Sequence, residues 1–334
     1  MNRRDALRWT LALGALPLAG RTQPSNAQQA GTAFAKSRRP WKIGLLMPTS
    51  TEPHFWNALK ERLAALGYVE GRDLVYESRS AEGRFEKLPA LARELVRMRP
   101  DLIVAAATPP LRAARDATST IPIVIATAGD PVSSGLVASL AQPGGNITGI
   151  SNIASGMSAK LLELVRTTLP KASRIAMLWN PANRADPGVD ARAAADKLGF
   201  RVIELHASVP ADIGVAFATL AKERAGALVV LSDPFLVSQR DRIVELALAQ
   251  RTPVFAQMVE LTRAGALMSY GADYADDFKR AASFVDRILK GAKPGDLPIE
   301  QAATFALIVN RKTANAIGIK IPNEILLRAT EVIE

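Results

Sequence analysis

The chain has 334 residues, with 42 Lys and Arg against 32 Asp and Glu, a formal charge of +10, and no cysteine. This length suits two domains of ordinary size, and a composition of 48% hydrophobic and 22% charged residues is typical of globular proteins. The lack of cysteine excludes disulfides, thiolate-bound metal centres and a cysteine nucleophile, and two histidines leave little basis for a His-rich metal site or a His-based triad. We therefore expect no cofactor and no catalytic step.

The first 27 residues have the layout of an export signal. Arg3 and Arg4 precede a weakly apolar stretch over residues 9–20, which is too short to span a bilayer as a helix. The arginine pair resembles the twin-arginine signal, and the small residues Ser25 and Ala27 predict cleavage after Ala27. A basic amphipathic start that stays attached is the alternative. We expect a mature protein that is free in the periplasm and has no membrane span.

The basic charge is partly a property of this signal. Removing residues 1–27 removes four arginines and one aspartate, so the formal charge falls from +10 to +7. The remaining basic residues are scattered among acidic ones, and their densest cluster, residues 36–39, lies in a leader over 28–40 that we expect to be flexible. A nucleic-acid-binding face would concentrate them on one stripe. We therefore expect no nucleic-acid partner.

Short apolar runs alternate with segments of helical period from Trp41 onward, a pattern typical of parallel strands joined by crossover helices. The expected strands of the first half are residues 43–47, 74–77, 102–106, 123–126 and 147–150. Between them, apolar residues recur at helical spacing over 55–66 and 88–98. The pattern predicts an open α/β sheet covered on both faces.

The second half repeats landmarks of the first. Residues 42–48 align with 174–181, and the Leu-Gly-aromatic sequence that begins at Leu66 recurs at Leu198. Chance agreement between ordinary strand–helix units is the alternative. We expect two similar Rossmann-like lobes with parallel sheets, lobe one over 41–152 and lobe two over 153–272, followed by a tail over 291–334 that the pattern assigns to neither.

Helices over 157–168 and 273–290 occupy equivalent places after the two lobes. If each packs on the opposite lobe, helix 273–290 covers lobe one and the chain crosses between the lobes several times. Such crossings form a hinge, with crossover points near Ser151 and Gly271.

Sequence motifs of catalysis are mostly absent. The chain contains no phosphate-binding G-x-x-x-x-G-K-[ST] loop, no G-x-S-x-G elbow and no H-E-x-x-H pair. Polar residues instead follow the predicted strands, where open α/β sheets bind ligands. The candidate ligand-binding residues are Thr49, Ser50, Thr108, Thr127 and Asp130 in lobe one, and Asn180, Asp233 and Tyr270 in lobe two.

Hydroxyl groups and helix-start amides suit a carboxylate, and a buried aspartate suits an amine. We therefore assign Thr108 and Thr127 to an acid group of the ligand and Asp130 or Asp233 to a cation or hydroxyl. Asn180 and Tyr270 would add contacts from the second lobe. The alternative for Thr108 and Asp233 is that each only caps the helix after it, because proline follows both.

Several segments, in order, resemble one family of ABC-transporter substrate-binding proteins. They include residues 66–72, 121–124, 129–132, 135–149, 267–271, 286–294 and 331–334. The resemblance covers the chain from about Lys42 to its end. It implies two hinged lobes, similar to type I periplasmic binding proteins, that close on a small solute. Some members of the family bind aromatic amino acids, whereas the loop over 49–56 is less family-like and is expected to contribute to ligand choice.

We therefore expect a monomeric periplasmic receptor that captures a small polar solute, such as an amino acid, and delivers it to an ABC permease and its ATPase. A sensor that signals to a membrane protein is the alternative. A periplasmic enzyme with Asp130 or Asp233 as acid or base is a further alternative, although no second catalytic group is evident.

Overall fold

The computed structural model describes residues 39–50, 53–152, 156–183 and 188–334. The predicted export signal, its cleavage after Ala27 and the leader up to residue 38 lie outside the described residues. Within the described ranges, no helix combines the length and apolarity that a membrane crossing requires.

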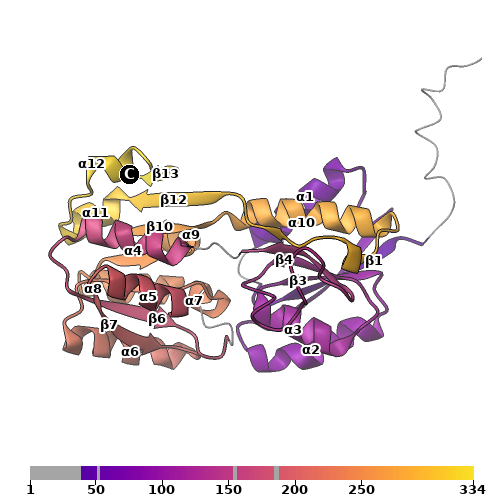
Figure 1. The fold of residues 1–334 in the computed structure, drawn as a ribbon, viewed down its shortest axis with the longest axis horizontal. Coiled ribbons are helices and arrows are strands. Elements are labelled where there is room, and N and C mark those ends of the chain that lie inside the picture. The colour runs from indigo at the N-terminus through magenta and orange to yellow at the C-terminus, as the bar shows by residue number, and fades with distance from the viewer. Residues whose placement is uncertain (1–38, 51–52, 153–155, 184–187) are drawn as a thin grey trace, which may run out of the picture. The chain divides into compact units, whose positions relative to one another are not determined.

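Two separate sheets organise the chain from residue 41 onward (Figure 1). The first has the strand order β11-β5-β4-β3-β1-β2 and the second β13-β12-β10-β9-β8-β6-β7. The strands of the first sheet are β1 (Trp41–Met47), β2 (Leu74–Ser80), β3 (Leu102–Ala106), β4 (Ile123–Thr127), β5 (Ile147–Ser151) and β11 (Glu300–Gln301). Those of the second are β6 (Arg174–Trp179), β7 (Arg201–His206), β8 (Leu228–Val230), β9 (Val254–Ala256), β10 (Met268–Ala272), β12 (Phe305–Asn310) and β13 (Glu331–Ile333).

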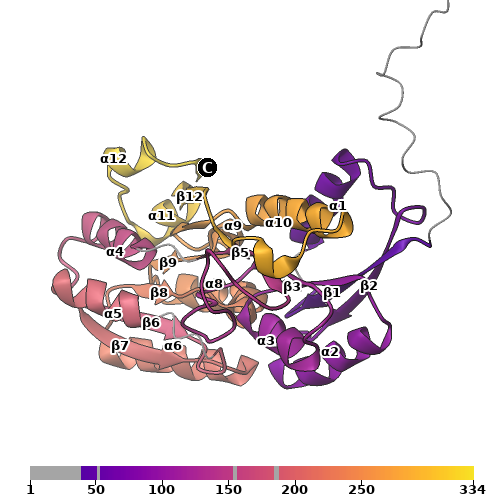
Figure 2. The same cartoon turned by 45° about the vertical axis from the view of Figure 1, so that its right-hand side comes forward.

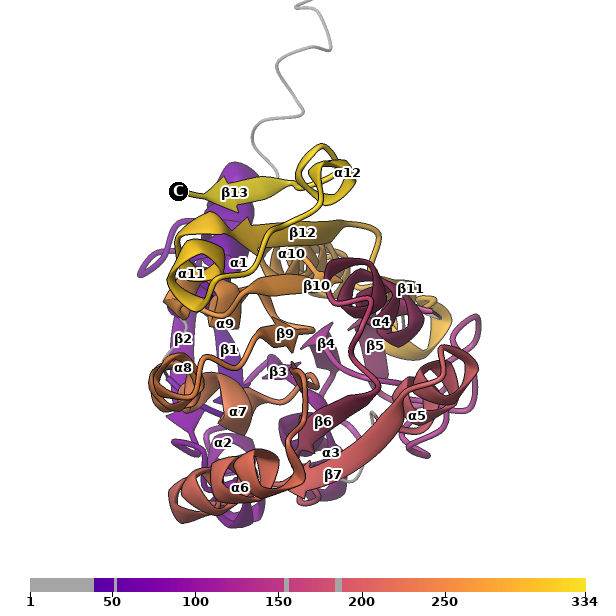
Figure 3. The ribbon, with the colours of Figure 1, turned by 90° about the vertical axis from the view of Figure 1, so that its left-hand side faces the viewer.

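Helices cover both faces of each sheet. On the first sheet, α1 (Pro53–Ala65) and α10 (Tyr274–Leu289) lie on one face, and α2 (Leu88–Arg97) and α3 (Thr108–Ala117) on the other (Figure 1). On the second, α4 (Met157–Thr168) and α5 (Gly188–Lys197) lie opposite α6 (Pro210–Glu223) and α8 (Arg240–Ala249) (Figure 3). The remaining helices are α7 (Pro234–Ser238), α9 (Val259–Ala264), α11 (Arg311–Ile317), α12 (Asn323–Leu326) and the 3-10 turns Phe85–Lys87 and Pro294–Asp296.

The order of strands confirms the predicted repeat. Strands β2-β1-β3-β4-β5 of the first sheet and β7-β6-β8-β9-β10 of the second follow the same doubly wound order with parallel pairing. The central strands β3 and β4 are buried throughout, as their continuous apolar runs predict. The expected α/β fold of two similar lobes is therefore correct, and β2 extends three residues beyond the predicted end at 77.

The chain passes between the sheets three times. Helix α4 follows β5 and packs against β9 and β10, whereas α10 follows β10 and packs against α1, β4 and β5 (Figure 2). The phenol of Tyr68 donates a hydrogen bond of 2.9 Å to Asp286 on α10, which ties this helix to the first sheet's side. The segment after α10 adds β11 beside β5, and the chain then returns to place β12 antiparallel to β10.

One glycine makes a close backbone approach at the second crossing. A Cβ atom at Gly271 would lie 1.8 Å from the carbonyl oxygen of Gln257, the residue that follows β9. Only a residue without a side chain lets the two backbones come this near. Gly271 therefore fixes where the end of β9 lies against β10.

Candidate functional site

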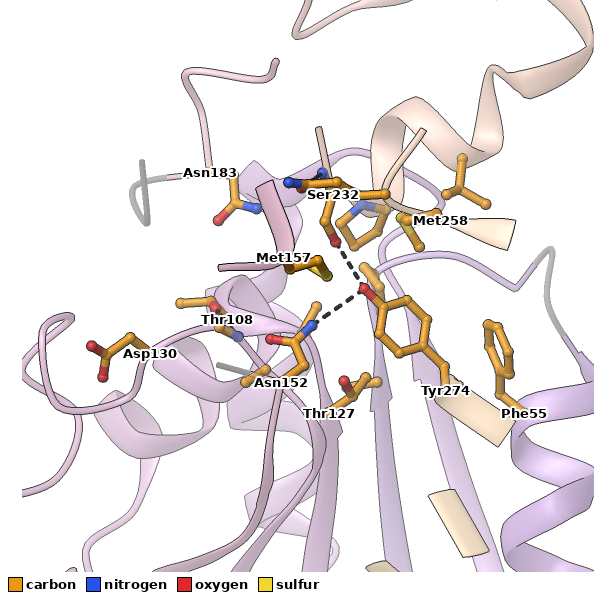
Figure 4. A pocket seen from close by; sticks show the side chains of 18 of the residues that line it. Phe55, Thr108, Thr127, Asp130, Asn152, Met157, Asn183, Ser232, Met258 and Tyr274 are labelled. Carbon is orange, nitrogen blue, oxygen red and sulfur yellow. Dashed lines mark hydrogen bonds between the residues drawn. The ribbon is translucent and has the colours of Figure 1, made fainter. Parts of the chain in front are cut away.

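A cavity of about 510 Å³ lies at the carboxyl ends of strands from both sheets (Figure 4). Thr49 follows β1, Thr108 follows β3, and Thr127 ends β4. From the second sheet, Ser232 follows β8 and Gln257 follows β9. Parallel strands end at the same edge of a sheet, so these five residues converge although they are distant in sequence. The volume is within the range of pockets that enclose small molecules.

Aromatic side chains form one side of this cavity. The rings of Phe55 and Tyr274 meet edge to face with centroids 5.8 Å apart, and Phe55 stacks on Phe278 at 5.5 Å. Trp56 meets Phe278 edge to face at 4.9 Å. These four side chains come from α1 and α10, which pack together on the first sheet. They offer an apolar aromatic surface against which another ring can pack.

Polar groups gather on the other side. Figure 4 shows Asn183, Thr108 and Asp130 on the side opposite to Phe55 and Tyr274. A second carboxylate, that of Asp190, also lines the cavity, and among the described residues that line it none is Lys, Arg or His. The potential inside therefore favours a positively charged group over an additional negative one.

The phenol of Tyr274 links residues of the two lobes across the cavity. Its oxygen accepts a hydrogen bond of 3.2 Å from Asn152 Nδ2 and shares one of 2.8 Å with Ser232 Oγ. Burial raises the pKa of Tyr274, so the phenol stays neutral at physiological pH. The amide of Gln257 accepts from the Ser232 backbone N–H at 2.9 Å and donates to Ser158 Oγ at 2.9 Å. This chain of hydrogen bonds holds the polar lining in place.

A buried carboxylate lies behind Thr127. Asp277 on α10 is 1% exposed and accepts a hydrogen bond of 3.4 Å from the Thr127 hydroxyl. Burial raises the pKa of Asp277 to about 7; the charge of Arg280 opposes the rise and that of Asp276 adds to it. The carboxyl group therefore titrates near neutral pH, in contact with Thr127, which lines the cavity.

A second buried carboxylate organises the lobe-two side. Asp233 caps α7, accepting from the backbone N–H groups of Phe235 at 2.9 Å and Leu236 at 3.2 Å. It also accepts from the side-chain amides of Asn180 at 3.2 Å and Asn183 at 3.0 Å. Burial raises the pKa of Asp233 to about 6, against the effect of these four hydrogen bonds. The carboxylate is thus fully engaged within the protein.

Asn183 and Asn180 differ in the partners of their side-chain amide oxygens. Asn180 Oδ1 accepts from Ser208 Oγ at 2.8 Å and from the Ala182 backbone N–H at 3.0 Å. Asn183 lines the cavity and is 8% exposed, and its Oδ1 atom is buried with no hydrogen-bond partner among the described residues.

Four of the eight predicted site residues line the cavity: Thr49, Thr108, Thr127 and Asp130. The Thr108 hydroxyl accepts from the Gly129 backbone N–H at 3.3 Å, so its own proton is available to another acceptor. Asp130 Oδ1 accepts from the backbone N–H groups of Val132 and Ser133, which fixes the loop at the cavity's edge.

The other four do not line it. Ser50 is exposed and donates to Glu82 at 2.9 Å. Asn180 and Asp233 lie behind the lining and bond to each other, in keeping with the capping alternative for Asp233. Tyr270 stacks on Phe305 of the neighbouring strand, with ring centroids 6.1 Å apart. Thr51, the third polar residue in the loop after β1, lies outside the described residues.

The cavity also contains residues that the strand-end argument did not select as ligand-binding: Phe55, Trp56, Asn152, Met157, Ser158, Asn183, Asp190, Ser232, Met258 and Tyr274. Tyr274 could have been found by helical spacing, because it precedes Phe278 by four residues on the stripe of α10 that packs on lobe one. Ser232 precedes Asp233 by one residue, and the strand end presents the serine because the aspartate turns back to cap α7.

Residues 53–333 match the family model described as ABC transporter substrate binding protein. The chain belongs to this family. It is 30% identical over 268 residues to a tyrosine-binding protein of Clostridioides difficile (strain R20291), which covers 80% of this chain and 76% of that relative. The family is one of substrate-binding proteins, as the resemblance in the sequence implies.

Three solved structures share the fold. A conserved domain protein of Vibrio cholerae O1 biovar eltor is 32% identical with a TM-score of 0.83, over 88% of this chain and 100% of that one. The ABC domain of Streptococcus pneumoniae in complex with L-Trp is 27% identical with a TM-score of 0.83 and the same coverage. The ligand-free, open structure of a substrate-binding protein with adhesive properties from Clostridium difficile is 26% identical with a TM-score of 0.65, over 88% and 99%.

Proposed function

We propose that this protein captures an amino acid with an aromatic side chain in the cavity between its lobes and delivers it to an ABC permease and its ATPase. The observation that carries the proposal is the division of the cavity into an aromatic side and a polar side (Figure 4). An aromatic amino acid likewise has an aromatic ring at one end and polar ammonium and carboxylate groups at the other. The relatives named for tyrosine and crystallised with L-Trp support the same substrate class.

The lining assigns an orientation to such a solute. Its ring would pack against Phe55 and Tyr274, which already meet edge to face. The Thr108 hydroxyl, at the start of α3, would donate to the carboxylate, and Asp130 would attract the ammonium group. The Thr127 hydroxyl donates its proton to Asp277. We therefore propose that Thr127 forms part of the cavity wall and that its oxygen accepts a hydrogen bond from the solute.

We propose that the lobes close on the solute about the three crossings. The fold scores 0.83 against the L-Trp complex but 0.65 against the ligand-free, open structure, at nearly the same sequence identity. Sequence divergence does not account for that difference, which supports a difference in lobe arrangement between the ligand-bound and the open form. A solute that contacts both lobes stabilises the closed arrangement and shifts the population toward it, which gives the permease a conformation to recognise.

The proposed place of action is the periplasm, reached through the twin-arginine route. Arg3 and Arg4 supply the paired arginines. Changing both to lysine is expected to retain the full-length precursor in the cytoplasm, as measured by cell fractionation. Unchanged export of the double variant would contradict this route.

Thermal unfolding of the ligand-stripped protein against amino acids, small carboxylates, purines and sugars tests the proposed function. A solute at 100 times its dissociation constant adds about 2.7 kcal/mol to the free energy of unfolding, which raises the melting temperature by several degrees. We expect the largest shifts with tryptophan, tyrosine or phenylalanine, and no product after incubation. A shift with sugars or purines alone would contradict the proposed substrate class, and turnover of a bound solute would contradict the receptor role.

A further inference from the structure

We propose that the hydrogen bond between the Tyr274 phenol and Ser232 Oγ holds the two lobes closed on the solute and sets how long the solute stays bound. This inference rests on the proposed function and adds to it a positioning role for Tyr274, exerted through Ser232 rather than through the aromatic ring. The bond is 2.8 Å long, and Asn152 Nδ2 donates to the same phenol oxygen at 3.2 Å (Figure 4). The phenol proton is therefore available to Ser232 Oγ.

Tyr274 is held by lobe one, although it follows β10 of the second sheet. It is the first residue of α10, which packs against α1, β4 and β5. Its ring meets that of Phe55 on α1 edge to face, and its side chain is buried. Asn152, the second partner of the phenol, follows β5, and its backbone N–H donates to the Ala128 carbonyl oxygen at 2.7 Å. The phenol therefore moves with the first sheet.

Ser232 is held by lobe two. It follows β8, and its backbone N–H donates to Gln257 Oε1 at 2.9 Å. Gln257 follows β9, and its amide donates in turn to Ser158 Oγ at 2.9 Å. Ser158 lies at the start of α4, which packs against β9 and β10. The bond from Tyr274 to Ser232 thus joins two groups that separate when the lobes turn apart about the crossings.

A hydrogen bond is short-ranged, so this one contributes to the closed arrangement alone. A separation of about 1 Å beyond its present length is enough to end it. In the open arrangement water takes the place of each partner, so the net gain from the bond is modest. A solute enters the open arrangement and leaves only after the lobes reopen. The bond therefore slows the departure of the solute and leaves its capture unaffected.

The test removes each partner of the bond and measures the two rate constants of binding. Tyr274→Phe keeps the ring beside Phe55 and removes the phenol, and Ser232→Ala removes the hydroxyl on the other lobe. Stopped-flow mixing with L-tyrosine, or with L-phenylalanine if tyrosine does not bind, follows the fluorescence of Trp56, which lines the cavity. The observed rate plotted against concentration gives the association rate constant as its slope and the dissociation rate constant as its intercept. We expect each variant to raise the dissociation rate constant by roughly 2- to 10-fold and to leave the association rate constant within about 2-fold.

The variant that carries both changes separates loss of this bond from two independent effects. Since Tyr274→Phe and Ser232→Ala remove the same bond, the double variant should dissociate no faster than the single variants. Tyr270→Phe is the matched control, because it removes a phenol outside the cavity from a ring stacked on Phe305, and it should keep both wild-type rate constants. Dissociation rates that multiply in the double variant, a change that falls on association, or wild-type rates in Tyr274→Phe would each overturn the inference. Failure of the wild type to bind any aromatic amino acid would overturn the proposed function, and this inference with it.

Discussion

Replacing Gly271 by alanine is expected to destabilise the protein by about 3 kcal/mol or more and to abolish solute binding. The added Cβ would meet the Gln257 carbonyl oxygen at 1.8 Å, and this neighbour is backbone rather than a flexible side chain. Relief requires the end of β9 to move away from β10. The Gln257 side chain would move with it and lose its bonds to Ser232 and Ser158, which line the cavity. Urea denaturation followed by circular dichroism measures the loss of stability.

Gly214→Ala is the matched control for this change. Gly214 lies exposed within α6, and a Cβ atom there would meet nothing within 4 Å. Alanine has a higher helix propensity than glycine, so this variant is expected to gain up to about 1 kcal/mol. The same Gly-to-Ala exchange thus has opposite effects at the two positions. Wild-type stability of Gly271→Ala would show that the two backbones are not in close approach.

Between pH 4 and pH 7 the free energy of unfolding is expected to fall as the pH rises. Asp277 has a pKa of about 7 in the folded state because it is buried, against 3.8 as its ordinary value. Between these two values the folded state binds more protons than the unfolded state, so raising the pH favours unfolding. The Asp277 contribution is on the order of 4 kcal/mol over this range. Asp233, whose pKa is raised to about 6, acts in the same direction.

Asp277→Asn is expected to flatten this dependence and to raise the free energy of unfolding at pH 8 by about 2–4 kcal/mol. The amide carries no charge to bury and can still accept a hydrogen bond from Thr127. Asp241→Asn, at an exposed position in the first turn of α8, is the control and should keep the wild-type slope. Urea denaturation at pH 5, 6, 7 and 8 measures the slope. An identical slope in Asp277→Asn and the wild type would contradict the burial of an ionisable group beneath Thr127.

The order of the elements could be predicted because each lobe is built from parallel strands buried on both faces. Such strands are continuous apolar runs, and the helices between them carry stripes at helical spacing, so the sequence alone predicts the strand over 102–106 and the helix over 157–168. The short edge strands could not be predicted in this way. Strand β11 has two residues, both exposed, and its place beside β5 depends on the path of the chain after α10.

The cavity could be predicted only in part, because the position of a residue at a strand end does not fix the direction of its side chain. Thr108 and Thr127 line the cavity as expected. Asp233, at an equivalent place, points into the protein because four donors satisfy its carboxylate there. Tyr270 packs on Phe305, which comes from a strand beyond α10 that the repeat does not include. Tyr274 reaches the cavity because α10 packs on the first sheet, so finding it requires its helical spacing to Phe278 together with this packing, and the strand-end argument alone does not select it.

The central claim is that the solute binds in the cavity between the lobes. Its most direct test is calorimetric titration of the wild type and Met157→Trp with the amino acid that gives the largest thermal shift. Met157 lies in the middle of the cavity in Figure 4, so an indole there would occupy the space that we assign to the solute. Leu327→Trp, at a position that is 80% exposed, is the control. We expect one solute per chain for the wild type and Leu327→Trp, and a loss of affinity of about 100-fold or more for a folded Met157→Trp. Wild-type affinity in Met157→Trp would contradict the claim, because the solute would then bind elsewhere.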